Sequence, residues 1–182
     1  MLARAFHDDP VWVWALPDAR RRRRVLPWVF TRIVALEARR VHVVGAGDVA
    51  AVALWVPPAA RPTTRGELWR AGFPLMPVRL GREGFRRVEA FQSASRGLLE
   101  RFGYRSAWFL SGLGVDPSAQ RGGLGTALVE WGLERARESR RPAVLLTSNA
   151  ENIPFYERLE LEVVAEERLP AEGPLTWAMR TR

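Results

Sequence analysis

The sequence predicts a single domain, residues 1–182, of the α/β (α+β) class, in which helices flank a central, mixed but mainly antiparallel sheet. Short β-favouring runs recur along the chain, and runs with apolar residues at helical spacing lie between them. At residues 108–126 a strand leads through a glycine-rich turn into a helix. The length suits one domain, and 47% hydrophobic and 26% charged residues are typical of a globular protein.

The expected elements follow in chain order. Residues 1–9 read as the end of a helix followed by a loop. We expect helices over residues 20–39, 64–71, 85–102 and 126–139, and a short one that contains residues 155 and 156. We expect strands over residues 41–44, 49–56, 108–115, 143–147 and 175–179, and one from about residue 161. The rest of residues 57–83 is expected to be a loop near the mouth of the active site.

Five consecutive arginines, residues 20–24, open the first long helix. We expect them to form a solvated helix entry, with contact to a bound polyanion as the alternative. Pro27 lies in the first turns of this helix or marks its true start. Before it, Trp12 and Trp14 alternate with apolar residues, and we expect them in the core rather than in a ligand pocket. The apolar side of the helix is formed by Leu26, Phe30, Ile33 and Val34.

The string VVGAGDVA, residues 43–50, looks like the start of a dinucleotide-binding fingerprint. A β-rich run follows it instead of a helix, so a β-hairpin is the better interpretation. His42 is then an ordinary strand residue.

The central stretch from Trp108 to Thr126 is suited to holding phosphate. Asp116-Pro117 ends the strand, and the turn of residues 121–125 leads into a helix. The backbone N–H groups of such a turn and of the first helical turn have no partners, and the helix dipole adds positive charge there. The chain has no lysine, which excludes a P-loop, and the glycine spacing does not fit a dinucleotide-binding turn.

The amino-acid composition limits the kinds of metal, membrane and nucleic-acid partner that the protein can have. The chain has no cysteine and two histidines, which gives no disulfide, thiolate site or convincing zinc site, so no metal is expected. No apolar run approaches the ~20 residues of a membrane span and no signal peptide opens the chain, so we expect a cytoplasmic protein with no membrane partner. The formal net charge is +8, all 28 basic residues are arginine, and they are spread along the chain apart from the run of residues 20–24. Nucleic-acid binding is therefore only a weak hypothesis.

Two motifs carry a family resemblance. Val115, Pro117, Gln120, Gly123 and Gly125 spell V-x-P-x-x-Q-x-x-G-x-G, which closely resembles the acetyl-CoA-binding motif of the GNAT acetyltransferases. The segment TSNAENIPFYERLELEVV resembles the closing motif of the same enzymes. Over residues 105–182 the chain looks most like the puromycin N-acetyltransferase branch, and the first hundred residues match more loosely.

This resemblance implies the GNAT fold, in which two splayed central strands form the acetyl-CoA cleft. GNAT chains usually begin with a strand, which is missing here, so the first sheet position is empty or the start is truncated. The turn would bind the coenzyme pyrophosphate, the strand before it would pair with the pantetheine arm, and two asparagines would contact pantetheine or cap a short helix. The implied coenzyme-binding residues are Leu113, Gly114, Val115, Gln120, Arg121, Gly122, Gly123, Leu124, Gly125, Thr126, Asn149 and Asn152.

Tyr156 matches the family position that donates to the departing thiolate. A tyrosine pKa of ~10 against ~8.5 for a thiol makes full proton transfer uphill by ~2 kcal/mol, so a lowered pKa or a concerted transfer is needed. An oxyanion donor is implied on the backbone near residues 113–115. The alternative for Tyr156 is a half-buried helix tyrosine with no catalytic role.

Two departures from the family pattern stand out. Glu160-Leu161 replaces the usual Gly-Phe, so Glu160 would be strained if this position has a positive φ. Ala107 replaces a histidine that some relatives carry at the start of the central strand. The general base therefore comes from Glu89, Glu83 or a water chain, or the amine binds already neutral.

The resulting prediction is an N-acetyltransferase that uses acetyl-CoA as co-substrate and a primary amine of a small molecule as acceptor. Its nearest rival is a protein N-acetyltransferase. From a different class, the chain could be a non-catalytic acyl-CoA-binding or regulatory module with the same core. A homodimer is compatible with either reading.

Overall fold

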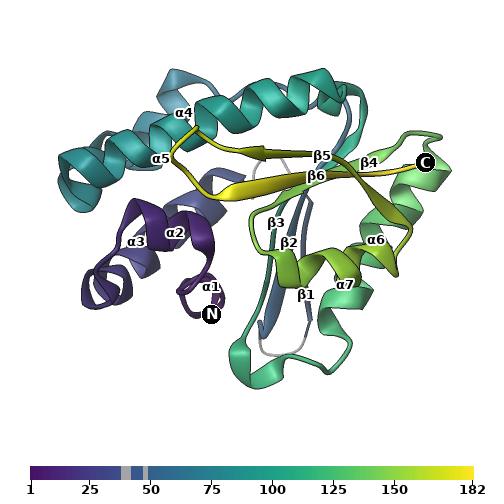
Figure 1. Ribbon diagram of the computed structural model, residues 1–182, viewed down its shortest axis with the longest axis horizontal. Helices are drawn as coiled ribbons and strands as arrows, with labels where there is room; N and C mark the ends of the chain where they lie inside the picture. Colours follow the sequence, from purple (N-terminus) through teal and green to yellow (C-terminus); the bar gives the residue numbers. More distant parts are fainter. Residues whose placement is uncertain (38–41, 47–48) are drawn as a thin grey trace.

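The computed structural model describes residues 1–37, 42–46 and 49–182. Six strands form one sheet in the order β1-β2-β3-β4-β6-β5 (Figure 1). All neighbouring strands are antiparallel except β3 and β4, which are parallel. The strands are β1 His42–Ala46, β2 Ala51–Val56, β3 Trp108–Val115, β4 Ala143–Thr147, β5 Leu161–Arg168 and β6 Leu175–Thr181.

Helices cover both faces of this sheet, and Figure 1 shows α5 on one side of β5 and β6 and α6 and α7 on the other. The α-helices are α1 Leu2–Ala5, α2 Pro10–Ala15, α3 Ala19–Glu37, α4 Arg65–Arg70, α5 Met76–Arg101, α6 Leu124–Glu138 and α7 Ile153–Glu157. The short 3-10 turns are η1 Phe73–Leu75, η2 Tyr104–Ser106, η3 Pro117–Ala119 and η4 Ala150–Asn152.

Alternation along the strands divides the core between the two faces, because successive side chains of a strand point to opposite sides. On β4, Leu145 belongs to the apolar cluster that includes Trp55 of β2 and Leu128 of α6. Val144 packs instead with Leu99 of α5 on the opposite face. A separate cluster joins α3 to the first half of α5, and its buried members are Leu16, Val29, Met76 and Leu80.

The predicted architecture is confirmed, and several local predictions need correction. Helix α3 begins at Ala19, so Pro27 lies in its interior and does not mark its start. Residues 72–83 are not a loop: η1 and the first turns of α5 cover most of them, with a kink where Gly81 has φ 70°.

The hairpin of β1 and β2 is present, and the middle of its turn, residues 47–48, falls outside the described residues, as does Val41. Residues 1–37 form helices only, so within the described ranges no strand precedes β1. No helix of the described chain is long and apolar enough to cross a bilayer.

Candidate functional site

The two central strands part from one another within the sheet. Strands β3 and β4 pair over only three residues each, from Trp108↔Ala143 to Leu110↔Leu145. Beyond this point β4 pairs only with β6, while β3 continues to Val115 with β2 as its one strand partner. Within the described chain, the edge of β3 from residue 111 onward therefore has no strand partner on the β4 side, and its backbone groups there can pair with an extended ligand.

Strands β3 and β4 stop pairing next to an irregularity in β3. Leu54 of β2 is opposite Gly112 and Trp55 is opposite Leu110, so Ser111 is an extra residue in the ladder. Its hydroxyl donates a hydrogen bond to the Leu54 carbonyl oxygen at 3.1 Å. A β-bulge bends its strand and locally ends pairing. Our sequence reasoning missed this bulge, although two glycines inside the second half of the strand, at residues 112 and 114, were a usable signal.

The turn after β3 presents a row of unpartnered backbone donors. Within the described chain, no backbone or side-chain acceptor receives a hydrogen bond from the N–H groups of residues 121–126. Arg121 and Gly123 have positive φ values of 65° and 80°, and Gly123 is the residue before α6. These donors lie at the N-terminus of a 15-residue helix, where the helix dipole favours an anion.

Glycine occupies the two motif positions, 123 and 125, for different structural reasons. A Cβ on Gly123 would meet no atom within 4 Å, so only its positive φ calls for glycine. Gly125 lies inside α6, and a Cβ there would be 3.5 Å from Val115 and 3.7 Å from Phe155. Gly125 thus lies where β3, α6 and α7 converge. Gln120 is exposed, with its amide nitrogen 3.5 Å from the Val115 carbonyl oxygen.

Asp116 joins this turn to the N-terminal helix. Its carboxylate is buried, caps η3 through the Ser118 N–H and pairs with the Arg4 guanidinium. The hydrogen bonds from Arg4 and Ser118 lower the pKa of Asp116 to about 2. Nearby, α1 packs so closely on β3 that a Cβ on Gly114 would be 2.5 Å from a methyl group of Leu2. Gly114 is therefore a close-approach position between α1 and β3.

Tyr156 lies on α7 in the same apolar cluster as Leu110 and Leu145, the residues at which β3 and β4 part. Its ring makes an edge-to-face contact with Phe155 at 5.0 Å between centroids. Its hydroxyl has no hydrogen-bond partner among the described residues, and burial raises the pKa of Tyr156 above its usual value. The pKa of Tyr156 is therefore not lowered, which leaves the other alternative, proton transfer concerted with bond breaking, or hydrogen-bond donation by the protonated hydroxyl.

The structure gives the side chains of Asn149 and Asn152 different environments. The Asn149 side chain caps η4 by accepting from the Glu151 N–H at 3.1 Å, which favours the capping alternative. Asn152 is exposed, makes no side-chain capping bond at the start of α7 and remains open to a ligand. Glu160 has φ 66°, so the predicted strain is present, and its carboxylate pairs with Arg137 at 2.7 Å.

The candidate bases differ in their environment. Glu83 accepts hydrogen bonds from Arg86 and Arg87, and the Arg86 bond lowers the pKa of Glu83 to about 2, which makes it a poor base. Glu89 is exposed on α5. Asp9, which sequence reasoning missed, is half-buried at the start of α2 and accepts from the Val11 N–H at 2.9 Å. Burial raises the pKa of Asp9 to about 6.

We expect Asp9→Asn to stabilise the protein at neutral pH, because asparagine preserves the helix cap and removes a half-buried charge. Since folding raises the Asp9 pKa from 3.8 to about 6, the folded state binds more protons between these values, and wild-type stability falls as pH rises through them. The gain should be near zero at about pH 4 and reach a plateau above about pH 6.5, at most about 3 kcal/mol. Urea unfolding at several pH values measures it.

Asp18→Asn is the matched control. Asp18 also accepts from backbone N–H groups at a helix start, those of Arg20 and Arg21, and these bonds lower its pKa. Its substitution should not stabilise the protein at neutral pH. Equal pH profiles for the two variants would contradict the assignment of the raised pKa to Asp9.

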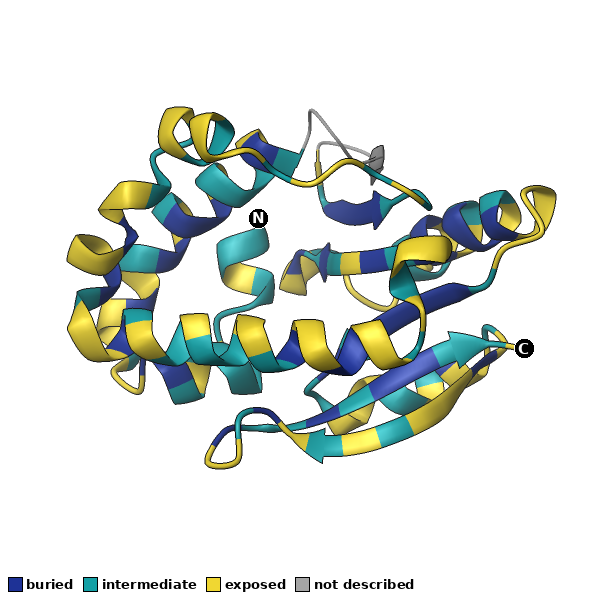
Figure 2. Cartoon of the chain, turned by 90° about the horizontal axis from the view of Figure 1, so that it is seen from above, coloured by how far each residue is buried: buried dark blue, intermediate teal, exposed yellow. Residues whose placement is uncertain are grey.

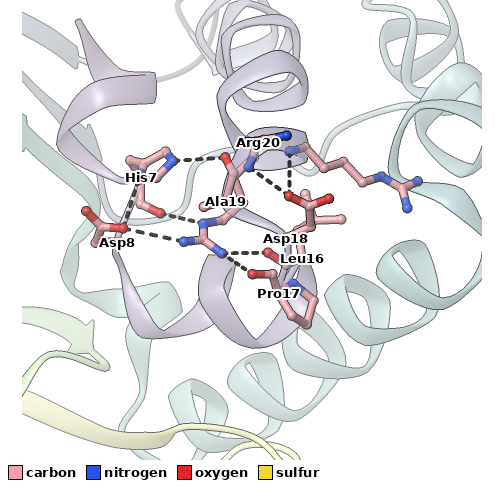
Figure 3. Close-up of polar contacts among 9 residues, drawn as sticks. His7, Asp8, Leu16, Pro17, Asp18, Ala19 and Arg20 are labelled. Carbon is pink, nitrogen blue, oxygen red and sulfur yellow. Dashed lines mark hydrogen bonds and ion pairs between the residues drawn. The ribbon is translucent and has the colours of Figure 1, made fainter.

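Arg22 is a second residue whose environment was not predicted from the sequence. The five arginines were expected to be solvated, yet Arg22 is buried. Its guanidinium donates to the carbonyl oxygens of His7, Leu16 and Pro17, each at 2.8 Å, and lies 3.4 Å from an Asp8 carboxylate oxygen (Figure 3). Arg22 therefore ties the loops on both sides of α2 to α3, while its neighbours in the run, residues 21, 23 and 24, are exposed.

Comparison with known proteins agrees with this geometry. Residues 101–160 match the model of the family described as Acetyltransferase (GNAT) family. This range includes β3, the glycine turn, α6, β4 and α7.

Two crystal structures are similar over nearly the whole chain. One is described as histone acetyltransferase HPA2 and related acetyltransferase from Corynebacterium glutamicum, with a TM-score of 0.65, 18% identity and coverage of 99% of this chain and 86% of that chain. The other is the mosquito arylalkylamine N-acetyltransferase like 5b, with a TM-score of 0.55, 13% identity and coverage of 97% and 88%. At these identities the likeness establishes the fold.

Proposed function

We propose that the chain is an acetyltransferase of the GNAT superfamily and transfers the acetyl group of acetyl-CoA to a primary amine of a small molecule. The observation that carries the proposal is the continuity of the opened edge of β3 with the row of free N–H groups at residues 121–126. A ligand with an extended arm that ends in a pyrophosphate would fit both features. Its arm would hydrogen-bond to the backbone of β3, and its anionic end would accept hydrogen bonds from the N–H groups of the turn. Coenzyme A has such a form.

In the proposed complex, the backbone of Leu113 to Val115 pairs with the pantetheine arm. The N–H groups of the turn, with Gln120 and Thr126 at its ends, receive the pyrophosphate. Asn152 is available to the arm, whereas the Asn149 side chain already caps η4. No metal takes part in this proposal.

The chemistry needs three contributions. Binding along β3 holds the thioester carbonyl next to the amine, and such positioning can supply several kcal/mol. A backbone N–H on β3 stabilises the tetrahedral oxyanion. As the intermediate collapses, the carbon–sulfur bond breaks, and the Tyr156 hydroxyl donates a hydrogen bond to the departing sulfur. The amine proton leaves through Glu89 or water, or the amine binds already neutral.

The acceptor class is supported by the resemblance of residues 105–182 to the puromycin N-acetyltransferase branch.

Titration calorimetry with acetyl-CoA tests the coenzyme site. We expect the parent protein to bind with micromolar affinity. Gly123→Ala should weaken binding about tenfold or more, because a Cβ at this positive φ costs about 1–2 kcal/mol and shifts the turn. Gly97→Ala is the control, since Gly97 lies in α5 and a Cβ there also meets nothing within 4 Å.

Absence of binding to the parent, or equal affinities for the two variants, would contradict the proposed site. Coenzyme binding without turnover on any amine would instead favour the non-catalytic acyl-CoA-binding alternative.

A further inference from the structure

Three of the most exposed large apolar side chains of the described chain lie within ten residues of one another. Val78 is 79% exposed, Trp69 73% and Leu75 52%. They belong to three consecutive elements, α5, α4 and η1. Large apolar side chains gathered at an exposed position commonly mark an interaction site.

Local structure holds these side chains outward. On η1 and the first turn of α5, Met76 and Leu80 are buried against α3, so Leu75 and Val78 lie on the outer side of the same turns. Helix α4 is fixed by a complete capping box between Thr64 and Glu67. Along the helices of the molecule, exposed residues alternate with intermediate and buried ones (Figure 2), as they do over residues 65–82. We name the exposed surface of this segment the Trp69 corner, which comprises Arg65, Trp69, Arg70, Leu75, Val78, Arg79 and Arg82.

The Trp69 corner is also cationic. All four of its arginines are exposed, and none has a carboxylate partner among the described residues. The one acidic residue within its span, Glu67, is bound by Arg61 through both carboxylate oxygens. Residues 1–37 and 57–90 hold 14 of the 28 arginines and seven acidic residues, so they carry +7 of the formal charge of +8.

The folded chain therefore does not spread its charge evenly, as the sequence analysis assumed. Within the corner, the Arg70 Nε donates to the Gly66 carbonyl oxygen at 3.2 Å and the Arg79 guanidinium lies 5.4 Å from the Trp28 ring centroid, so the four charges are exposed but not neutralised by a carboxylate of the described chain. Exposed apolar side chains beside such charges fit a surface that offers both negative charge and a hydrocarbon layer within reach. A second copy of the same corner would bring like charges together. Nucleic acid would pair with the arginines but would leave Leu75 and Val78 without an apolar partner.

We propose that the Trp69 corner docks on the surface of an anionic lipid bilayer, as a peripheral contact separate from acetyl transfer. Trp69, Leu75 and Val78 enter the headgroup layer, and the four arginines contact lipid phosphates. This departs from the expectation of no membrane partner, which considered only spanning segments.

Co-sedimentation of the full chain with vesicles tests the proposal. Phosphatidylcholine vesicles that contain about a third phosphatidylserine should bind at least tenfold more tightly than pure phosphatidylcholine vesicles, and added salt should weaken binding. Trp69→Ser with Val78→Asp should reduce binding at least tenfold. Val164→Asp is the apolar control, because Val164 is 40% exposed on β5, far along the chain from the corner.

A second pair of variants tests the charge. Arg65→Gln with Arg82→Gln should weaken binding, whereas Arg96→Gln with Arg141→Gln removes the same charge from exposed positions outside the corner and should have less effect. Any of four results would overturn the proposal: no vesicle binding, equal binding to both vesicle types, equal losses in corner and control variants, or concentration-dependent dimerisation of the free protein that the corner variants abolish.

Discussion

Tyr156→Phe should lower kcat for acetyl transfer about 100-fold while the affinity for acetyl-CoA stays within about twofold, since loss of a general acid or equivalent donor typically costs 10²–10⁴-fold. The substitution removes only the hydroxyl, which makes no hydrogen bond to the described protein, and leaves the ring in its apolar cluster. The thermal midpoint should therefore change little. Initial rates with a reactive amine, calorimetry with the coenzyme and a melting curve give the three quantities.

The raised pKa of Tyr156 makes this prediction more specific. Burial disfavours the phenolate, so the hydroxyl stays protonated through the working range and can donate throughout. The pH–rate profile should then show no falling limb from Tyr156 below about pH 10, its ordinary pKa. Full transfer of the proton to the thiolate is more unfavourable than the reference values suggest, which favours hydrogen-bond stabilisation of the leaving sulfur or transfer concerted with bond breaking.

The chain offers a control, because Tyr104 is its only other tyrosine. Tyr104 lies before β3 and packs on Phe109, outside the apolar cluster of Tyr156. Tyr104→Phe should leave kcat within about twofold. If both variants kept full activity, the assignment of Tyr156 to the leaving group would be wrong. If Tyr156→Phe lost coenzyme affinity instead of kcat, its role would be in binding.

The features that the sequence predicted well are those set by neighbours along the chain. Asp116-Pro117 ends β3 and the glycine turn begins α6 because each depends on a few adjacent residues. One position of a motif led us to expect strain at Glu160 if its φ were positive, and the structure meets this condition. Such local signals were enough for the fold and for the proposed coenzyme turn.

The features that were missed depend on contacts between distant segments. The bulge at Ser111 exists because β2 and β3 pair with different registers on its two sides. The close packing of Leu2 on Gly114 and the pairing of Arg4 with Asp116 join residues more than 100 positions apart. The raised pKa of Asp9 is a consequence of burial by the folded chain. Apart from the glycines at residues 112 and 114 beside the bulge, none of these features leaves a periodic or motif signal in the sequence.

The same limit applies to Arg22, whose substitution should have the largest effect on stability. In the sequence it is one of five equivalent arginines, but only its guanidinium reaches three backbone carbonyl oxygens in the interior. Arg22→Met would fill much of the same volume and leave those carbonyl oxygens without this donor. We expect a loss of about 3–5 kcal/mol in the free energy of unfolding, as for other broken buried charge networks. Urea unfolding measures it.

Arg23→Met is the matched control, since Arg23 is the next residue on α3, is exposed and should change stability by at most about 0.5 kcal/mol. Arg22→Lys keeps the charge but cannot reproduce the forked geometry, so it should fall between the two. A loss below about 1 kcal/mol for Arg22→Met would show that water replaces the guanidinium at little cost. A large loss confined to Arg22 would mean that one arginine of the run organises the N-terminal helices, including the α1 that packs on β3.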